Sequence, residues 1–209
     1  MFDSGTLTFR EFVMSEPLPL STIQSSVLEF LRSRDDGVVF GAQAVNAYVS
    51  EPRMTQDVDI LSTRAEELAG ELRDHLSQAF HIAVRVREIG EGRGYRLFQI
   101  RKSGNRHLVD VRPVDALPST QRVAGVLVIA PADLIASKVI SYHRRLAQPK
   151  SFTDRRDIAM LLLKFPELKR GSGPVADCLR RAGAGPEVMA AWDELVAQEI
   201  RAPDADDDF

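Results

Sequence analysis

The stretch Asp57-Val58-Asp59-Ile60-Leu61 guides our interpretation of the fold, because polar and apolar residues alternate along it. Alternation with a period of two is typical of a β-strand that packs one face on a core. Val58 and Ile60 then point into the core, while Asp57 and Asp59 point together to the opposite face, about 7 Å apart. The stretch therefore predicts a strand that carries two neighbouring carboxylates.

The segments around this strand predict an α+β (α/β) fold. Upstream, apolar residues at helical spacing begin at Ser21, a short apolar strand spans 38–40, and Gly41 opens another helix. Downstream, a helix over 65–76 precedes three strand segments that turns connect into an antiparallel meander, at 82–89, 95–100 and 107–111. We therefore expect a mixed sheet with flanking helices.

Beyond Pro131 the pattern contains helical spacing only, which predicts a helical bundle at 131–147, 152–165, 173–182 and 185–200. The expected organisation has four parts: an N-terminal arm at 1–20, an α/β domain at 21–130, a helical domain at 131–203 and an acidic tail at 204–209.

Composition narrows the classes of protein that remain. The 209 residues carry 30 acidic and 27 basic side chains, a net charge of -3, which argues against a general nucleic-acid coat protein. Cys178 is the single cysteine, so a disulfide framework and a cysteine-based zinc cluster are excluded. No apolar run approaches the roughly 20 residues that span a bilayer. We expect a cytoplasmic protein with no membrane partner.

A third carboxylate follows from the same alternation. In Leu108-Val109-Asp110-Val111 the valines fill the core face, which leaves Asp110 on the opposite face. If this strand neighbours the one with Asp57 and Asp59, the three carboxylates converge. Such hard oxygen ligands suit Mg²⁺ or Mn²⁺, and these ions suit nucleotide phosphates. The alternative is an ordinary pair of acidic residues on a solvent-facing strand.

Gly41 lies where a buried strand ends and a helix begins. Free backbone amides and the helix dipole can hold a phosphate at such a point. The alternative is an ordinary strand-to-helix turn.

Lys138 lies within the apolar stripe of its helix rather than opposite it, so it must snorkel to solvent or meet an anion. The anion is either a substrate phosphate or a carboxylate of the protein itself. On the next helix we expect Asp154 to face Lys138, whereas Asp157 is explained by favourable charge near the helix N-terminus. Basic residues cluster at this junction, as an acceptor-binding patch or a solvated turn: Arg144, Arg145, Lys150, Arg155 and Arg156.

In this order the features resemble the minimal nucleotidyltransferases, and most closely the AbiEii/AbiGii branch of type IV toxin nucleotidyltransferases. The match spans roughly residues 35 to 165 and comprises a glycine motif, a metal motif, a third carboxylate and a helical motif: Phe40-Gly41-Ala42-Gln43-Ala44, Arg53-Met54-Thr55-Gln56-Asp57-Val58-Asp59-Ile60, Asp110, and Asp133-Leu134-Ile135-Ala136-Ser137-Lys138 with Arg145 and 150–158. Where this family usually has Gly-Ser or Gly-Gly, the chain has Gly41-Ala42, so a backbone amide would replace a hydroxyl donor.

The resemblance implies a role for each of these residues. The metal ligands would be Asp57, Asp59 and Asp110. The nucleoside triphosphate would contact Gly41, Ala42, Gln43, Arg53, Thr55 and Lys138. The catalytic set would be Asp57, Asp59, Asp110, Lys138 and Asp154, with Asp110 as a third ligand or general base.

The leading hypothesis is a metal-dependent nucleotidyltransferase that moves a nucleoside monophosphate from a triphosphate to an acceptor hydroxyl. The resemblance implies an RNA (such as tRNA) or protein acceptor and a toxin role with an antitoxin partner. One alternative is a small-molecule nucleotidyltransferase of the antibiotic-modifying type. Another is a non-catalytic module that binds a nucleotide or a protein partner, which the Gly41-Ala42 pair favours.

Overall fold

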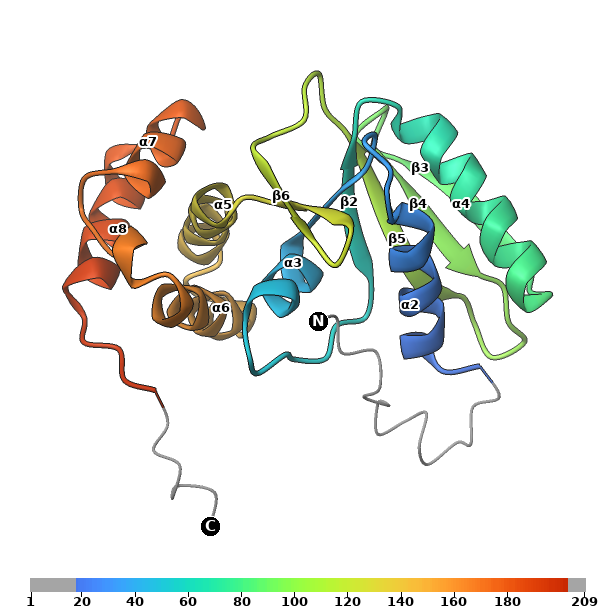
Figure 1. The fold of residues 1–209 in the computed structure, drawn as a ribbon, viewed down its shortest axis with the longest axis horizontal. Helices are drawn as coiled ribbons and strands as arrows, with labels where there is room; N and C mark the ends of the chain where they lie inside the picture. Colours follow the sequence, from blue (N-terminus) through green and yellow to red (C-terminus); the bar gives the residue numbers. More distant parts are fainter. Residues whose placement is uncertain (1–17, 203–209) are drawn as a thin grey trace, which may run out of the picture. The chain divides into compact units, whose positions relative to one another are not determined.

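A computed structural model describes residues 18–202 of the chain. The chain divides between Ile129 and Ala130 into two compact units, which we call the first and the second unit (Figure 1). Most of the predicted arm and the whole predicted acidic tail lie outside the described residues. Across 18–202, no helix combines the length and the apolar character needed to cross a membrane.

The first unit is built on a seven-stranded mixed sheet in the order β3-β4-β5-β2-β1-β7-β6. Its strands are β1 (Val38–Phe40), β2 (Val58–Ser62), β3 (Val84–Ile89), β4 (Gly94–Gln99), β5 (Arg106–Pro113), β6 (Thr120–Val123) and β7 (Val126–Ile129). Its helices are α2 (Leu20–Leu31), α3 (Gly41–Tyr48) and α4 (Ala65–Phe80). The pairs β1–β7 and β2–β5 are parallel, and the remaining neighbours are antiparallel.

The predicted fold class and the meander of β3, β4 and β5 are confirmed. Strand β6 was not predicted from the sequence, because its short segment contains Gln121 and Arg122 and lacks an apolar period. It is an edge strand that, among the described strands, pairs only with β7, across a two-residue turn. Both turn residues, Ala124 and Gly125, have positive φ, the geometry that tight hairpins require.

The two faces of the sheet differ in chemistry. On one face, Val58 and Ile60 of β2 and Val109 and Val111 of β5 are fully buried. Helix α4 packs over this face, as Figure 1 shows. There the hydroxyl of Tyr95 on β4 donates a hydrogen bond to Glu66 of α4 at 3.2 Å. The opposite face of β2 to β5 carries charged side chains, and we call it the polar face.

The second unit is helical, as predicted, although the helices end a few residues before the expected limits. Its elements are α5 (Pro131–Arg144), α6 (Lys150–Lys164), the 3₁₀ turn η1 (Pro166–Leu168), α7 (Pro174–Arg181) and α8 (Pro186–Ala197). Helices α5, α7 and α8 each begin with proline, whose fixed φ and missing N–H suit the first helical position. Trp192 of α8 is fully buried, and its indole N–H donates to the Arg170 carbonyl at 3.1 Å.

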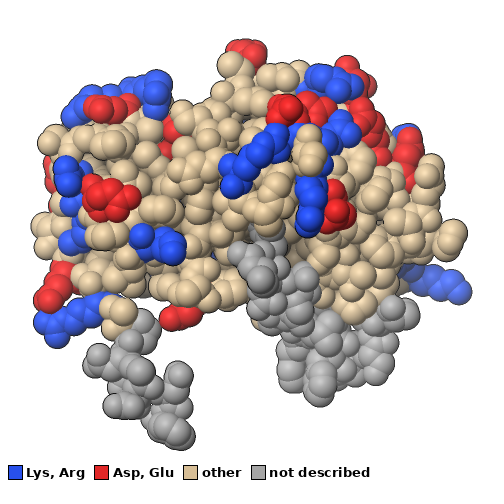
Figure 2. Space-filling model, in the orientation of Figure 1, with Lys and Arg blue, Asp and Glu red and all other residues tan. Residues whose placement is uncertain are grey.

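On the face that Figure 2 draws, basic and acidic side chains are interspersed among uncharged residues. This agrees with the small net charge of -3. Any strongly charged surface must therefore be small and local, and the polar face of the sheet is one such surface.

Candidate active site

A single row of paired residues crosses the polar face from the edge strand to the glycine motif. It runs through five strands as Arg87, Arg96, Asp110, Asp59 and Phe40. Residues that pair directly on neighbouring strands share a face, so these side chains project to the same side. Gly41 follows Phe40 immediately, which brings the glycine motif beside Asp59, with Asp110 on the next strand.

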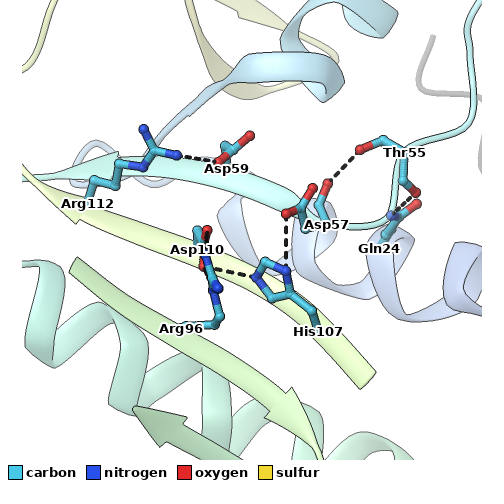
Figure 3. A network of polar contacts seen from close by, with 8 residues as sticks. All are labelled: Gln24, Thr55, Asp57, Asp59, Arg96, His107, Asp110 and Arg112. Carbon is cyan, nitrogen blue, oxygen red and sulfur yellow. Dashed lines mark hydrogen bonds and ion pairs between the residues drawn. The ribbon is translucent and has the colours of Figure 1, made fainter. Parts of the chain in front are cut away.

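Asp110 is the most buried carboxylate of the row, with 5% of its surface exposed. Arg96 binds it with both ends of the guanidinium, Nε to Oδ1 at 2.7 Å and Nη2 to Oδ2 at 2.8 Å. His107 Nε2 lies 2.9 Å from Oδ1 (Figure 3). Burial opposes ionisation, but the hydrogen bonds from Arg96 and His107 outweigh it and hold the pKa of Asp110 well below its ordinary value. Asp110 is thus an ionised anchor.

His107 links Asp110 to Asp57, because its other nitrogen, Nδ1, lies 3.2 Å from Asp57 Oδ2. Ligand atoms of Asp57, His107 and Asp110 all lie within 4.8 Å of one another. His107 was not predicted as a site residue, since residues three apart on a regular strand point to opposite faces. The pairing shifts at Leu108, where a β-bulge returns His107 to the face of Asp110.

Asp59 lies next to Asp110 in the row but forms its own contacts. Its Oδ1 lies 3.3 Å from Arg112 Nη2, and the Arg112 guanidinium is 5.0 Å from the centroid of the Phe40 ring. On its other side, a β-carbon added to Gly41 would lie 2.3 Å from Asp59 Oδ2. Gly41 also has φ +69°, which disfavours residues with a β-carbon. The glycine is therefore required for the close approach of the glycine motif to this carboxylate.

Helix α3 holds Gly41 in this position. At its C-terminal end, the Tyr48 hydroxyl donates a hydrogen bond to the Ile129 carbonyl of β7 at 2.9 Å. Burial raises the pKa of Tyr48 to about 12, so the hydroxyl stays protonated near neutral pH. Ala42, the second residue of α3, is half-buried.

Two residues expected to bind the nucleotide belong to a hydrogen-bond chain that supports Asp57. Thr55 Oγ1 donates to the Asp57 carbonyl at 3.0 Å, and Gln24 of α2 donates to the Thr55 carbonyl at 3.0 Å. Gln43 is buried and donates to Gln24 Oε1 at 3.2 Å. In this structure Gln43 and Thr55 therefore position the metal motif. Figure 3 shows the part of this chain that joins Gln24, Thr55 and Asp57.

The backbone of Arg53 is fixed from α3. The Asn46 side chain accepts from the Arg53 N–H at 3.0 Å and donates to the Arg53 carbonyl at 2.8 Å. Asn46 was not identified from the sequence, although an asparagine inside a short helix is a useful signal of such side-chain to backbone bonding. The start of the metal motif is thus tied to the helix that begins at Gly41.

In the second unit, Lys138 meets protein carboxylates, the second of the two alternatives that the sequence left open. Lys138 Nζ lies 2.6 Å from Asp157 Oδ2 and 3.7 Å from Asp154 Oδ1. Asp154 is bound more closely by Arg145, at 2.7 Å. Asp154 thus faces Lys138, as expected, but the expectation that it is better placed than Asp157 is corrected: Asp157, fully buried about one turn further along α6, is nearer to Lys138.

The residues of the first unit fit a divalent cation on the chemistry of their donors. Asp57 and Asp110 offer carboxylate oxygens and His107 an imidazole nitrogen, a set that suits Mn²⁺ as well as Mg²⁺. Asp59 lies outside this trio but is the strand neighbour of Asp110. One constraint is clear: Asp110 already accepts three contacts, and a carboxylate has about four acceptor positions.

No protein-family model and no curated protein matches the sequence. The fold resembles two solved structures. The Megavirus polyadenylate synthase matches at TM-score 0.57 and 15% identity, and the match covers 70% of this chain and 32% of the synthase. JHP933 from Helicobacter pylori matches at TM-score 0.53 and 12% identity, and the match covers 91% of this chain and 92% of JHP933. The chain thus spans about a third of the synthase's length. These likenesses show the fold, which is nucleotidyltransferase-like.

Proposed function

We propose that the chain is a metal-dependent nucleotidyltransferase that moves a nucleoside monophosphate from a nucleoside triphosphate to an acceptor hydroxyl. The row of paired residues from Arg96 to Phe40 carries this proposal, because it places carboxylates on one face of the sheet next to the glycine motif that begins at Phe40. In the reaction the acceptor oxygen bonds to the α-phosphorus, the bond from that phosphorus to the bridging oxygen breaks, and pyrophosphate leaves while the hydroxyl proton passes to solvent. Such chemistry depends mainly on positioning and charge neutralisation.

The ion would be held by Asp57, Asp59 and Asp110, with His107 as a further ligand from the same cluster. A divalent cation there supplies charge neutralisation of the phosphates and makes a bound hydroxyl more acidic. Since the pKa of Asp110 is held low, Asp110 is a poor proton acceptor, and we assign it to the ligand set rather than to general-base catalysis.

The triphosphate would lie on the side of Gly41, where backbone amides at the start of α3 can donate to it. Arg53 would contribute charge from the loop that α3 fixes. From the second unit we assign Lys138 and Asp154 to nucleotide binding and catalysis, as the resemblance implies. Lys138 would then have to exchange Asp157 for a phosphate.

For the biological role we propose a toxin of the AbiEii type that acts in the cytoplasm on RNA or protein, with an antitoxin partner. The support is the order of the four motifs along the chain. A small-molecule acceptor fits the same metal site. An assay that offers RNA, protein and small-molecule acceptors distinguishes these three substrate classes.

A second candidate, a non-catalytic binding module, has one specific observation in its favour. Arg96 and His107 already use three of the about four acceptor positions of Asp110. An ion that needs Asp110 must therefore compete with internal cations. In a module that binds without turnover, these contacts would persist.

The test incubates the protein with labelled nucleoside triphosphates, Mg²⁺ or Mn²⁺, and pools of RNA, protein and small-molecule acceptors. We expect transfer by the wild type and a loss of about 100-fold or more in Asp57→Asn, because metal binding supplies several kcal/mol and each 1.36 kcal/mol is tenfold in rate. Asp74→Asn, on the exposed surface of α4, is the matched control and should retain full activity.

Thermal unfolding with and without metal and triphosphate separates the two candidates, because a ligand that binds only the folded state raises Tm. A metal-dependent rise without transfer to any acceptor would favour the binding module. Absence of both the rise and the transfer would refute the proposed function.

A further inference from the structure

The polar face continues beyond the carboxylates to the edge of the sheet, where it becomes basic. Arg85 and Arg87 of β3 are exposed and point to this face, since they pair directly with Phe98 and Arg96 of β4. Within residues 18–202 neither Arg85 nor Arg87 has a carboxylate partner. Arginines that lack an internal partner are available to an external anion.

A second row of paired residues runs parallel to the first and ends beside the carboxylates. It passes from Arg85 through Phe98 to His107, which contacts Asp57. The rings of Phe98 and His107 are 5.6 Å apart. We call the surface of Arg85, Arg87 and Phe98 the edge surface. Neighbouring strands are about 4.8 Å apart, which puts the backbone of β3 about 10 Å from that of β5.

The order of the strands places the two substrates on opposite sides of the carboxylates. Along the first row, Gly41 and α3 follow β1 on one flank of the carboxylates, and the edge surface lies on the other flank. In phosphoryl transfer the attacking and leaving oxygens lie roughly in line on opposite sides of the phosphorus. If the departing pyrophosphate lies toward Gly41, the acceptor hydroxyl must approach from the side of β4 and β3.

We propose that the edge surface binds the acceptor, and that the acceptor is an RNA strand. This proposal rests on the proposed function, and it differs from the sequence-based alternative that places the acceptor on the basic cluster of the second unit. The edge surface is a second binding element in the first unit, contiguous with the residues assigned to the metal.

The chemistry of the edge surface favours RNA over an acidic peptide. Arg85 and Arg87 are two residues apart on one strand, so their side chains project on the same face about 7 Å apart and can meet successive charges of a phosphate backbone. Phe98 provides an aromatic ring between these arginines and the carboxylate cluster, and single-stranded RNA binds sheet surfaces by stacking bases on such rings. An acidic peptide would use the arginines but gain little from the ring.

A different explanation exists for charged residues on an edge strand, which is that they prevent pairing with the edges of other sheets. That explanation predicts no effect of Arg85 and Arg87 on RNA binding. The two explanations can therefore be separated by charge reversal.

The experiment compares the full chain with the double variant Arg85→Glu/Arg87→Glu. We measure binding of a fluorescent single-stranded RNA by anisotropy over a range of salt concentrations, and transfer to RNA from a labelled triphosphate. The control is Arg32→Glu/Arg73→Glu, which makes the same charge change at two exposed positions, one directly after α2 and one in α4. Arg85→Lys/Arg87→Lys, which keeps the charge, is the conservative variant.

We expect the double glutamate variant to bind RNA at least about tenfold more weakly and to lose about 1.4 from the slope of log K against log salt, at about 0.7 for each phosphate contact on a single strand. Transfer to RNA should fall in parallel. The rise of Tm with metal and triphosphate should stay at the wild-type value. The control and the lysine variant should remain within about twofold of wild type in binding.

Wild-type RNA affinity and salt slope in the double glutamate variant would overturn the proposal. So would loss of transfer to a protein acceptor with RNA binding unchanged, which would point to an acidic peptide. If the wild type transfers no nucleotide but binds RNA through Arg85 and Arg87, the proposed function fails while the edge surface stands, so the two failures are distinguishable.

Discussion

Substitution of Gly41 by alanine tests the link between the glycine motif and the carboxylates. Gly41 has φ +69°, and an added β-carbon would lie 2.3 Å from Asp59 Oδ2, 3.1 Å from Asp59 Cγ and 3.2 Å from Asp59 Cβ. The carboxylate must therefore move, and it must move away from the position in which it contacts Arg112. The variant perturbs Asp59 without changing its chemistry.

Two effects are expected to lower the free energy of unfolding of Gly41→Ala, and one is expected to raise it. A left-handed backbone costs an alanine about 1–2 kcal/mol. Displacement of Asp59 adds the weakening of a partly exposed ion pair, up to about 1 kcal/mol. An offset of about 0.4–1 kcal/mol comes from the lower entropy of the unfolded chain when glycine becomes alanine. We expect Gly41→Ala to be less stable by about 1–2 kcal/mol, and to lose the metal-dependent rise of Tm with a triphosphate.

The assay is thermal unfolding of the full chain with and without metal and triphosphate, where 1 kcal/mol corresponds to about 2–4 °C for a protein of this size. Gly70→Ala in α4 is the control, since an added β-carbon there has no atom within 4 Å. It should be neutral or more stable by up to about 1 kcal/mol. If Gly41→Ala matches wild type in both Tm and response to ligand, the inferred contact of Gly41 with Asp59 is refuted.

Two further predictions concern the charge pairs. Arg96→Gln should lower stability by about 1–3 kcal/mol at pH 7 by weakening the hydrogen bonds that keep Asp110 ionised. A depressed pKa contributes stability above the ordinary Asp value of about 3.9 that is lost as pH falls, so urea unfolding should show the difference from wild type shrinking below that pH; a constant difference contradicts it. Lys138→Met should cost about 3–5 kcal/mol in chemical denaturation because Asp157 is fully buried, and adding Asp157→Leu should recover much of the loss. No recovery would mean that the pair is not the cause.

The organisation of the sheet was predictable where the pattern was local. Val58 and Ile60 alternate with carboxylates, and the glycines after Ile89 turn β3 into β4, so strands and turns follow from spacing and backbone preference. The edge strand β6 escaped prediction because an edge strand buries little and needs no apolar period.

The candidate site was only partly predictable. Asp59 and Asp110 could be assigned to one face, since each strand has a period of two and one buried side. His107 could not, because the bulge at Leu108 reverses the alternation, and a bulge depends on how β5 pairs with β4. The structural roles of Gln43 and Thr55 likewise depend on Gln24, a residue of a different helix.

The sequence by itself determined which residues could carry charge to the polar face and where the chain turns from strand to helix. It also indicated that Lys138 needs an anion. The tertiary structure decided what these charges meet: Arg96 on Asp110, Arg112 on Asp59 and Asp157 on Lys138. The physical reason is that periodicity selects a face within one element, whereas a charge pair requires the register between two elements, which only their packing determines.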